Sequence, residues 1–188
     1  EKDLAYFIEM EFRKKGDIAF PVIVASGENS ALPHARASEK RIKFGEAIVI
    51  DIGAKFRGYS SDMTRTVFLG KASDELKNVY QIVYDAQKKA IDFLISQISK
   101  NKSKIKAKDV DDTARKYIKD KGYGEYFGHG LGHGVGLEVH EKPWISFLSK
   151  DKITPNMVFT IEPGIYLPNL GGVRIEDLIV LREKAVSY

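Results

Sequence analysis

The stretch Gly128-His-Gly-Leu-Gly-His-Gly-Val-Gly-Leu-Glu-Val-His-Glu-Lys-Pro143 holds three of the four histidines of the 188-residue chain, His129, His133 and His140. Five glycines alternate with other residues at its start and disfavour a helix, because each costs roughly 1 kcal/mol in a helix interior. We therefore expect irregular backbone, which lets main chain approach a ligand or metal closely, and neutral imidazole is a common metal ligand. The alternative is a flexible surface loop with histidines by chance.

Two carboxylates flank a predicted hairpin in the first half of the chain. Asp51 interrupts a β-branched run, Ala47–Ile52, that is otherwise typical of a buried strand, and Asp62 lies near the start of a second predicted strand. If the chain reverses around Phe56–Gly58, the two acids are equidistant from the turn and face each other about 5 Å apart. Like charges that close raise a pKa unless a cation lies between them.

The same arrangement recurs near the C-terminus. Glu162 and Glu176 are equidistant from the turn signal Pro168–Gly172, and each lies in a predicted strand that is otherwise apolar, Met157–Tyr166 or Val173–Leu181. Each side chain is therefore expected to point into a core or a cleft rather than into water. Acids on the solvated face of a hairpin are the alternative, but four buried acids without counter-charge would cost several kcal/mol each.

The histidine stretch and the four acids together predict a metal centre. Four carboxylates with one imidazole are more than one divalent ion needs, and they suit two metals about 3.5–4 Å apart that activate a water and clamp a carbonyl oxygen. Hard oxygen ligands favour manganese, iron(II) or cobalt over a thiolate-type zinc site. The predicted ligands are Asp51, Asp62, His133, Glu162 and Glu176.

The chain resembles the pita-bread metallopeptidases, the family of methionine aminopeptidase, aminopeptidase P, Xaa-Pro dipeptidase (prolidase) and creatinase. The resemblance runs over nearly all of the chain and rests on five motifs: Asp51-Ile-Gly, Ser61-Asp-Met-Thr-Arg-Thr, His129 to Glu141, Glu162-Pro-Gly-Ile-Tyr and Arg174-Ile-Glu-Asp. It implies one catalytic domain over residues 1–188 with the α+β pita-bread fold. Duplicated helix-plus-hairpin halves are expected to surround a central antiparallel sheet.

The resemblance also implies a role for each metal ligand. Asp51 is expected to be a terminal ligand of one metal, and Asp62 and Glu176 are expected to bridge the two. His133 and Glu162 would complete the second metal. Glu162 also matches the family's general base and acid, which takes a proton from the bridging water and delivers it to the leaving nitrogen.

Four further residues match functional positions of the family. His140 matches the histidine that binds the substrate carbonyl, and His129 fits an extra histidine of the proline-specific branch. His34 matches a third histidine that lines the substrate pocket. Arg174 aligns with an arginine that supports the carboxylate network.

Within the family, the histidine stretch looks most like Xaa-Pro dipeptidases and the shorter Xaa-Pro aminopeptidases. The resemblance therefore implies hydrolysis of the bond before proline, in a dipeptide or at a peptide N-terminus, by a metal-bridging hydroxide. The implied cofactors are two divalent ions, manganese or cobalt first, with iron or zinc as alternatives. Methionine aminopeptidase and a non-catalytic pita-bread binding module are the competing interpretations; His129 argues against the first, and the intact ligand set argues against the second.

Composition limits the remaining classes of function. A chain of 188 residues with 43% apolar content predicts a single domain with one substantial core. The sequence has no apolar run of roughly 20 residues and no signal peptide at its start, so we expect no membrane partner and a cytoplasmic location. Zero cysteines exclude disulfides and thiolate metal sites. The basic run Lys100–Lys108 lacks aromatic residues, which favours a solvated linker between helices over a nucleic-acid surface.

Residue spacing predicts the elements that carry these motifs. The expected helices are 2–15, a long helix from the N-cap Ser73 to about Ile98, and 107–121, which ends at Gly122. The expected strands outside the two acid-bearing hairpins include 20–25. Family members add a further helix and, in the proline-specific branch, an N-terminal domain that often forms the dimer. We expect these parts to be absent from this chain and the full-length protein to be a homodimer.

Overall fold

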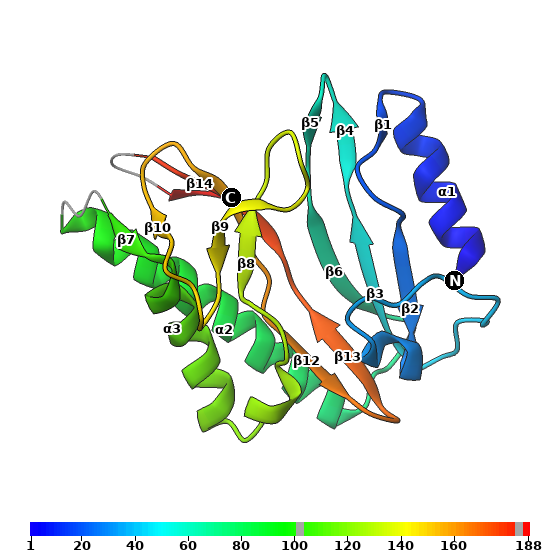
Figure 1. The fold of residues 1–188 in the computed structure, drawn as a ribbon. Coiled ribbons are helices and arrows are strands. Elements are labelled where there is room, and N and C mark those ends of the chain that lie inside the picture. Colours follow the sequence, from blue (N-terminus) through cyan, green and yellow to red (C-terminus); the bar gives the residue numbers. More distant parts are fainter. Residues whose placement is uncertain (101–103, 183–185) are drawn as a thin grey trace.

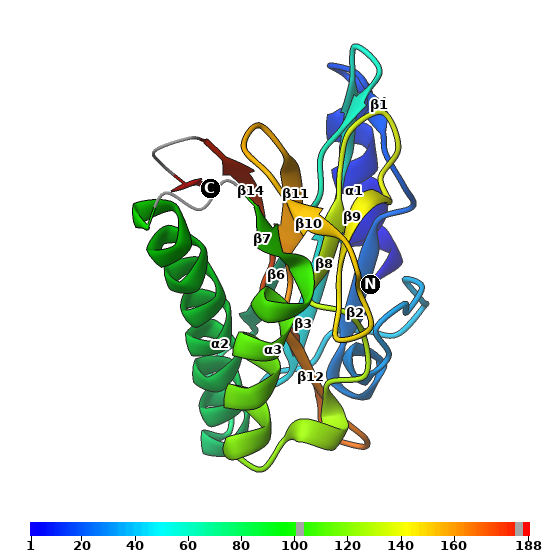
Figure 2. The same cartoon turned by 60° about the vertical axis from the view of Figure 1, so that its left-hand side comes forward.

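The computed structural model describes residues 1–100, 104–182 and 186–188, and it is built of two halves whose strands meet side by side (Figure 1). Helix α1 flanks a three-stranded sheet in the first half, whereas α2 and α3 pack together against a five-stranded sheet in the second (Figure 2). The helices are α1 (Lys2–Arg13), α2 (Asp74–Ser99) and α3 (Ala107–Asp120). Helices and antiparallel strands therefore occur in each half, as the predicted α+β class requires.

The first half pairs its strands in the order β2 (Ile23–Ser26), β3 (Ala47–Ile52), β6 (Met63–Phe68). Helix α1 presents Leu4, Ala5 and Ile8 to Val24 and Ile48 of this sheet, as its amphipathic spacing predicts. It ends two residues before the predicted boundary, and the predicted strand 20–25 begins only at residue 23. Pro21 lies among the three predicted residues, 20–22, that the strand does not include, and proline has no N–H to donate to a sheet.

The hairpin that carries Asp51 and Asp62 has a different register from the predicted one. Its outer arms, β4 (Ala54–Phe56) and β5 (Tyr59–Ser60), are joined by Arg57 and Gly58, both at positive φ, 51° and 88°. Two such residues form the tight turn that matches strand twist. Asp51 is consequently paired with Thr64. The predicted direct pairing of Asp51 with Asp62 is wrong, but a shift of two residues keeps both acids on one face.

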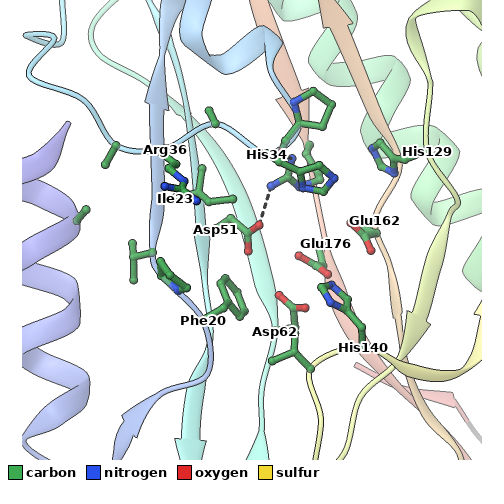
Figure 3. Close-up of a pocket in the computed structure, with 18 of the residues that line it drawn as sticks. Phe20, Ile23, His34, Arg36, Asp51, Asp62, His129, His140, Glu162 and Glu176 are labelled. Carbon is green, nitrogen blue, oxygen red and sulfur yellow. Dashed lines mark hydrogen bonds and ion pairs between the residues drawn. The ribbon is translucent and has the colours of Figure 1, made fainter.

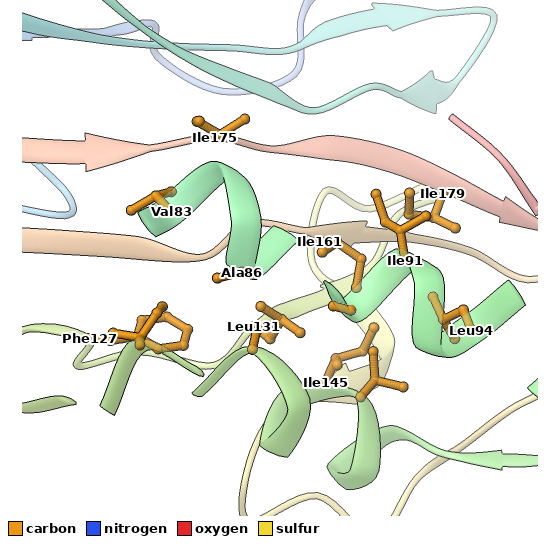
Figure 4. Close-up of a cluster of buried hydrophobic side chains, with 14 of the residues drawn as sticks. Val83, Ala86, Ile91, Leu94, Phe127, Leu131, Ile145, Ile161, Ile175 and Ile179 are labelled. Carbon is orange, nitrogen blue, oxygen red and sulfur yellow. The ribbon is translucent and has the colours of Figure 1, made fainter. Parts of the chain in front are cut away.

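Helix α2 runs through the main core. Ser73 caps it by accepting a hydrogen bond from the Leu76 N–H at 3.2 Å, as predicted. Apolar side chains of α2 meet strand residues of the second half in Figure 4, where the labelled residues include Val83, Ala86, Ile91, Leu94, Ile161, Ile175 and Ile179. This packing fixes the two acid-bearing segments that follow Ile161 and Ile175.

The histidine stretch is more regular than predicted. Residues Gly132–Gly134 form β8, which contributes to the sheet β15 (Val186–Ser187), β14 (Asp177–Leu181), β11 (Val158–Ile161), β8, β9 (Glu141–Ile145). A Cβ on Gly132 would collide with the Thr160 carbonyl oxygen, and a Cβ on Gly134 with that of Lys142. Because these glycines have no Cβ, neighbouring strands can approach them closely. A short strand can therefore form within a glycine-rich sequence.

The second hairpin has the predicted register but not continuous strands. Pairing of β11 with β14 ends at Ile161 and Asp177, and pairing of β12 (Gly164–Leu167) with β13 (Gly171–Arg174) begins at Gly164 and Arg174. Glu162 and Glu176 lie between the two ladders. The Glu162 N–H donates to the Leu131 carbonyl at 2.8 Å, and the Glu176 N–H to the Thr64 carbonyl at 3.1 Å. The backbone N–H groups of both acids therefore bond to other segments of the chain instead of to the opposite strand of the hairpin.

Thr66 joins the halves directly. Its hydroxyl accepts from the Arg174 N–H at 3.0 Å and donates to the Arg174 carbonyl at 2.8 Å.

Shorter elements complete the chain: β1 (Asp17–Ile18), β7 (Ile105–Lys106), β10 (Lys152–Ile153) and the 3₁₀ turns Gly27–Ala31 and Gly124–Tyr126. Helix α3 stops at Asp120, close to prediction, and Gly122 has φ 88°. In the predicted linker, residues 101–103 lie outside the described residues.

Among the described helices, we find none with both the length and the apolar character of a membrane span.

Candidate metal centre

All five predicted ligands converge where the two halves meet (Figure 3). One oxygen from each of Asp51, Asp62 and Glu176 lies within 4.8 Å of the others, and the same limit holds for ligand atoms of His133, Glu162 and Glu176. Glu176 thus belongs to both groups. The first half contributes Asp51 from β3 and Asp62 just before β6, while the second half contributes the other three residues. A shared carboxylate between two ligand groups is the arrangement that a pair of cations needs.

Arg174 fixes the orientation of Asp51. The Arg174 side chain is buried, and its Nη2 donates to Asp51 Oδ2 at 2.7 Å. Its Nε donates to the Thr64 hydroxyl at 3.1 Å, and that hydroxyl donates to Glu176 Oε2 at 2.7 Å. The other oxygen, Asp51 Oδ1, is buried and has no hydrogen-bond partner among the residues that the structure describes. A buried carboxylate oxygen without a partner is costly, so its position suits a cation.

The electrostatics of the acids also suit cations. Burial, together with the charges of Asp51 and Glu162, raises the pKa of Asp62 to about 8. Burial and the charges of Glu162, Asp62 and Asp51 raise the pKa of Glu176 well above its usual range. Burial likewise raises the pKa of Asp51 despite the nearby Arg174. Three acids must therefore take up protons or share positive charge, and divalent cations would supply that charge.

His133 presents one ring nitrogen to the acids. Its Nδ1 lies 3.0 Å from the Gly134 carbonyl oxygen, which can only accept, so Nδ1 carries the hydrogen. Nε2 then lies 3.2 Å from Glu162 Oε1 and 3.6 Å from Asp62 Oδ2. Burial lowers the pKa of His133, but the hydrogen bond and charge of Glu162 outweigh burial and raise it. An imidazole nitrogen held between two carboxylates by a carbonyl behind it has the orientation of a metal ligand.

His129 takes part in a hydrogen-bonded chain that the sequence did not reveal. Its Nδ1 donates to the Gly130 carbonyl at 2.7 Å, so Nε2 accepts from the Tyr166 hydroxyl at 2.8 Å. Arg174 Nη1 donates to the same hydroxyl at 3.0 Å. Burial raises the pKa of Tyr166 to about 12 and lowers the pKa of His129. Tyr166 is the last residue of the quoted motif Glu162-Pro-Gly-Ile-Tyr, which was the signal for it.

The two remaining histidines lie at the mouth of the site. The ring of His140 packs edge-on against that of His133, with centroids 4.4 Å apart, and burial lowers the pKa of His140. His34 is exposed and also lines the cavity, and the Pro33 carbonyl before it accepts from Arg174 at 3.1 Å. All predicted site residues are therefore brought together around one cavity.

The cavity has a volume of about 1510 Å³, large enough for a short peptide. Figure 3 shows that Phe20, Ile23 and Arg36 lie on the Asp51 side, whereas His129 and Glu162 lie on the opposite side. Trp144 also lines the cavity, and no motif in the sequence pointed to it. The two sides of the cavity are therefore lined by different kinds of side chain.

Known proteins match the chain over nearly its whole length. The sequence profile of metallopeptidase family M24 matches residues 1–183. The Xaa-Pro dipeptidase of Pyrococcus horikoshii is 48% identical over 183 residues, which are 96% of this chain and 50% of that protein. The chain spans about half the length of the curated relatives it matches.

Two solved structures have the same fold over all of this chain. Prolidase from Pyrococcus furiosus has a TM-score of 0.91 and 45% identity, and the match covers 100% of this chain and 54% of that one. The X-Pro aminopeptidase from Thermotoga maritima has a TM-score of 0.91 and 48% identity, with 100% and 51% covered. The two carry different activity names at equal structural similarity.

Proposed function

Because the chain belongs to metallopeptidase family M24, we propose that its cavity binds two divalent cations and hydrolyses the peptide bond before a proline. Membership confirms the resemblance to pita-bread metallopeptidases, and the solved structures confirm the α+β pita-bread fold. One observation carries the proposal: buried Glu176 belongs to two groups of metal-competent side chains at once. Asp51 would complete one cation site with it, and His133 and Glu162 would complete the other. Asp62 is grouped with Asp51 and Glu176 and also with His133, so it would be shared between the two sites.

Two cations at such a site lower the pKa of a bound water and polarise a substrate carbonyl. Manganese and cobalt suit this oxygen-rich donor set best, with iron(II) or zinc as alternatives. Asp51 Oδ1, which has no hydrogen-bond partner among the described residues, and the raised pKa of Asp62 both support binding of cations here.

Glu162 is proposed as the general base and acid. Burial raises its pKa, but the His133 hydrogen bond and the charges of His129 and His133 outweigh burial and hold the pKa below its usual value. Its Oε1 already accepts from the Thr160 hydroxyl at 3.1 Å and lies beside His133, which leaves Oε2 to take the proton of the attacking water. Glu162 then delivers that proton to the leaving prolyl nitrogen.

The other side chains orient the substrate. His140 faces the cavity, and its lowered pKa keeps it neutral near pH 7, so its ring N–H is proposed to bind the substrate carbonyl oxygen. His129 is held by Tyr166, and Arg174 holds both Tyr166 and Asp51. The nitrogen of a cleaved peptide bond leaves as an amine only when it takes up a proton, and Glu162 is proposed to supply that proton to the prolyl nitrogen.

Selectivity for proline is supported by the names of the similar proteins. The Pyrococcus horikoshii relative is named Xaa-Pro dipeptidase, and the solved neighbours are named prolidase and X-Pro aminopeptidase. We propose a proline-containing dipeptide or peptide N-terminus as substrate. The intact ligand set argues against a non-catalytic binding module. Homodimer formation by the full-length protein and a cytoplasmic location stay predictions from the sequence.

Cleavage of Met-Pro by the full-length protein tests this proposal. We expect Mn²⁺- or Co²⁺-dependent release of proline, loss of that activity after chelation, and no comparable cleavage of the matched dipeptide Met-Ala. Cleavage of Met-Pro-Ala as well would indicate an aminopeptidase. Preferential cleavage of Met-Ala would contradict proline selectivity, and failure to cleave any of these peptides with metal bound would favour a binding module.

A further inference from the structure

Helix α2 buries a primary amide among apolar side chains. Gln87 is 4% exposed, and its buried neighbours along the helix include Val83, Ala86, Ala90 and Ile91. In Figure 4 the labelled residues Val83, Ala86 and Ile91 enter the core from this helix. A buried amide destabilises a core unless its hydrogen-bonding groups are satisfied. The hydrogen-bond partners of the Gln87 amide therefore indicate the role of this side chain.

Those partners lie next to two metal-facing acids. Gln87 Nε2 donates to the Ile161 carbonyl at 3.1 Å and to the Asp177 Oδ2 carboxylate oxygen at 3.0 Å, with the Ile175 carbonyl at 3.4 Å. Backbone carbonyls can only accept, so the amide must present its NH₂ group to them. Ile161 precedes Glu162, whereas Ile175 and Asp177 flank Glu176. One side chain thus contacts the chain beside both acids.

The contacts fall at the interruption of the sheet. Pairing of β11 with β14 ends at Ile161 and Asp177, so the ladder gives no direct pairing to Glu162 and Glu176. Gln87 ties both sides of this gap to helix α2. A ligand whose backbone is held in place loses less freedom when it binds a cation.

Arg65 holds the same segment from the other side. Its Nη2 lies 2.5 Å from Asp177 Oδ1, and its Nη1 donates to the carbonyls of Glu176 and Thr64. Asp177 is therefore bound at both oxygens, by Gln87 on the core side and by Arg65 on the other. Glu176 lies between residues that are fixed from both directions.

We infer that Gln87 is a positioning residue for Glu162 and Glu176 and thereby sets the cation affinity of the whole centre. The inference rests on the proposed function, because it concerns ligands of the proposed cations. Glu176 belongs to both ligand groups, so a displaced Glu176 weakens both cation sites. Gln87 touches no reacting atom and acts only through these two carboxylates.

Gln87→Met tests this role in the full-length protein, because methionine keeps the unbranched shape and removes the donor. Calorimetric titration of the metal-free protein with Mn²⁺ is expected to show affinity weaker by about 10- to 100-fold, the usual effect of losing a residue that supports a metal ligand. The visible absorption of bound Co²⁺, which reports ligand geometry, is expected to change as well.

Gln97→Met is the matched control. Gln97 lies on the same helix and is 7% exposed, but its amide donates to the Ser96 hydroxyl at 3.2 Å rather than to the acid-bearing strands. This variant is expected to bind Mn²⁺ with wild-type affinity. Gln87→Asn, which keeps the amide on a shorter stem, is expected to weaken binding less than Gln87→Met and provides the measurement if the methionine variant fails to fold.

The outcomes separate this inference from the proposed function. Wild-type Mn²⁺ affinity and an unchanged Co²⁺ spectrum in Gln87→Met, or in Gln87→Asn if only that variant folds, would overturn the role of Gln87 and leave the proposed function intact. Equal weakening in Gln97→Met would also overturn it, since the effect would then come from helix packing. A wild-type protein that binds no Mn²⁺ would overturn both.

Discussion

Replacing Glu162 with glutamine is expected to lower kcat for Met-Pro by about 100- to 10,000-fold, the usual contribution of general acid–base catalysis. Glutamine keeps the shape of the side chain but cannot take a proton from water or pass it to the leaving nitrogen. The hydrogen bond from the Thr160 hydroxyl, 3.1 Å in the wild type, can persist through the amide oxygen. The measurement is steady-state kinetics at saturating Mn²⁺, with bound metal counted in the same sample.

Glu138→Gln is the matched control, since Glu138 is an exposed glutamate of the histidine stretch and does not line the cavity. It is expected to keep wild-type kcat. A Glu162→Gln protein that retains its metal and most of its kcat would show that another group moves the proton. Loss of activity that extra Mn²⁺ fully restores would limit Glu162 to the role of a ligand.

In the metal-free protein, the free energy of unfolding is expected to rise as pH falls from about 8 to about 6.5. Burial raises the pKa of Asp62 to about 8 and the pKa of Asp51 and Glu176 in the same direction. A carboxyl group with a raised pKa binds its proton more tightly in the folded state, so folding gains stability as pH falls through that pKa. The raised pKa of His133 acts with the same sign.

Other groups limit this window. Burial lowers the pKa of His129 and of His140 below the ordinary value of 6.5, so protonation of these rings favours unfolding at lower pH. The lowered pKa of Glu162 adds the same effect below 4.5. The expected gain from Asp62 between pH 8 and pH 6.5 is of the order of 1–2 kcal/mol, at about 1.4 kcal/mol per pH unit.

Urea unfolding of the chelated protein across this range measures the effect. The Mn²⁺-saturated protein is the comparison, and it should be more stable at pH 8, because cations hold the carboxylates ionised and stabilise the folded state by mass action. Its stability should not rise as pH falls. A chelated protein whose stability falls steadily from pH 8 to pH 6.5 would contradict the proposed crowding of buried acids.

Much of the site followed from residue types that are costly in a core. Asp51, Glu162 and Glu176 stood out as acids in apolar surroundings, and the structure brings them together with Asp62 and His133. Short-range signals were also sufficient for the start of α2, where Ser73 supplies the cap. An acid within an apolar run and a helix cap are both recognised from the residues that lie next to them in the sequence.

Features that depend on an unusual backbone conformation or on tertiary contacts were not predicted. The register of the first hairpin depends on positive φ at Arg57, which a non-glycine residue rarely adopts. Strand β8 forms because Gly132 and Gly134 let other strands approach, a contact that the local glycine content conceals. Gln87 resembles any other polar residue of a long helix until its distant partners, Ile161 and Asp177, are known.

Anomalous scattering from a crystal of the full-length protein grown with Mn²⁺ tests whether two cations bind at the junction of the two halves. We expect two manganese peaks about 3.5–4 Å apart, both touching Glu176, with Asp51 on one ion and His133 on the other. A single peak, or peaks away from these residues, would contradict a two-cation centre at the junction of the two halves.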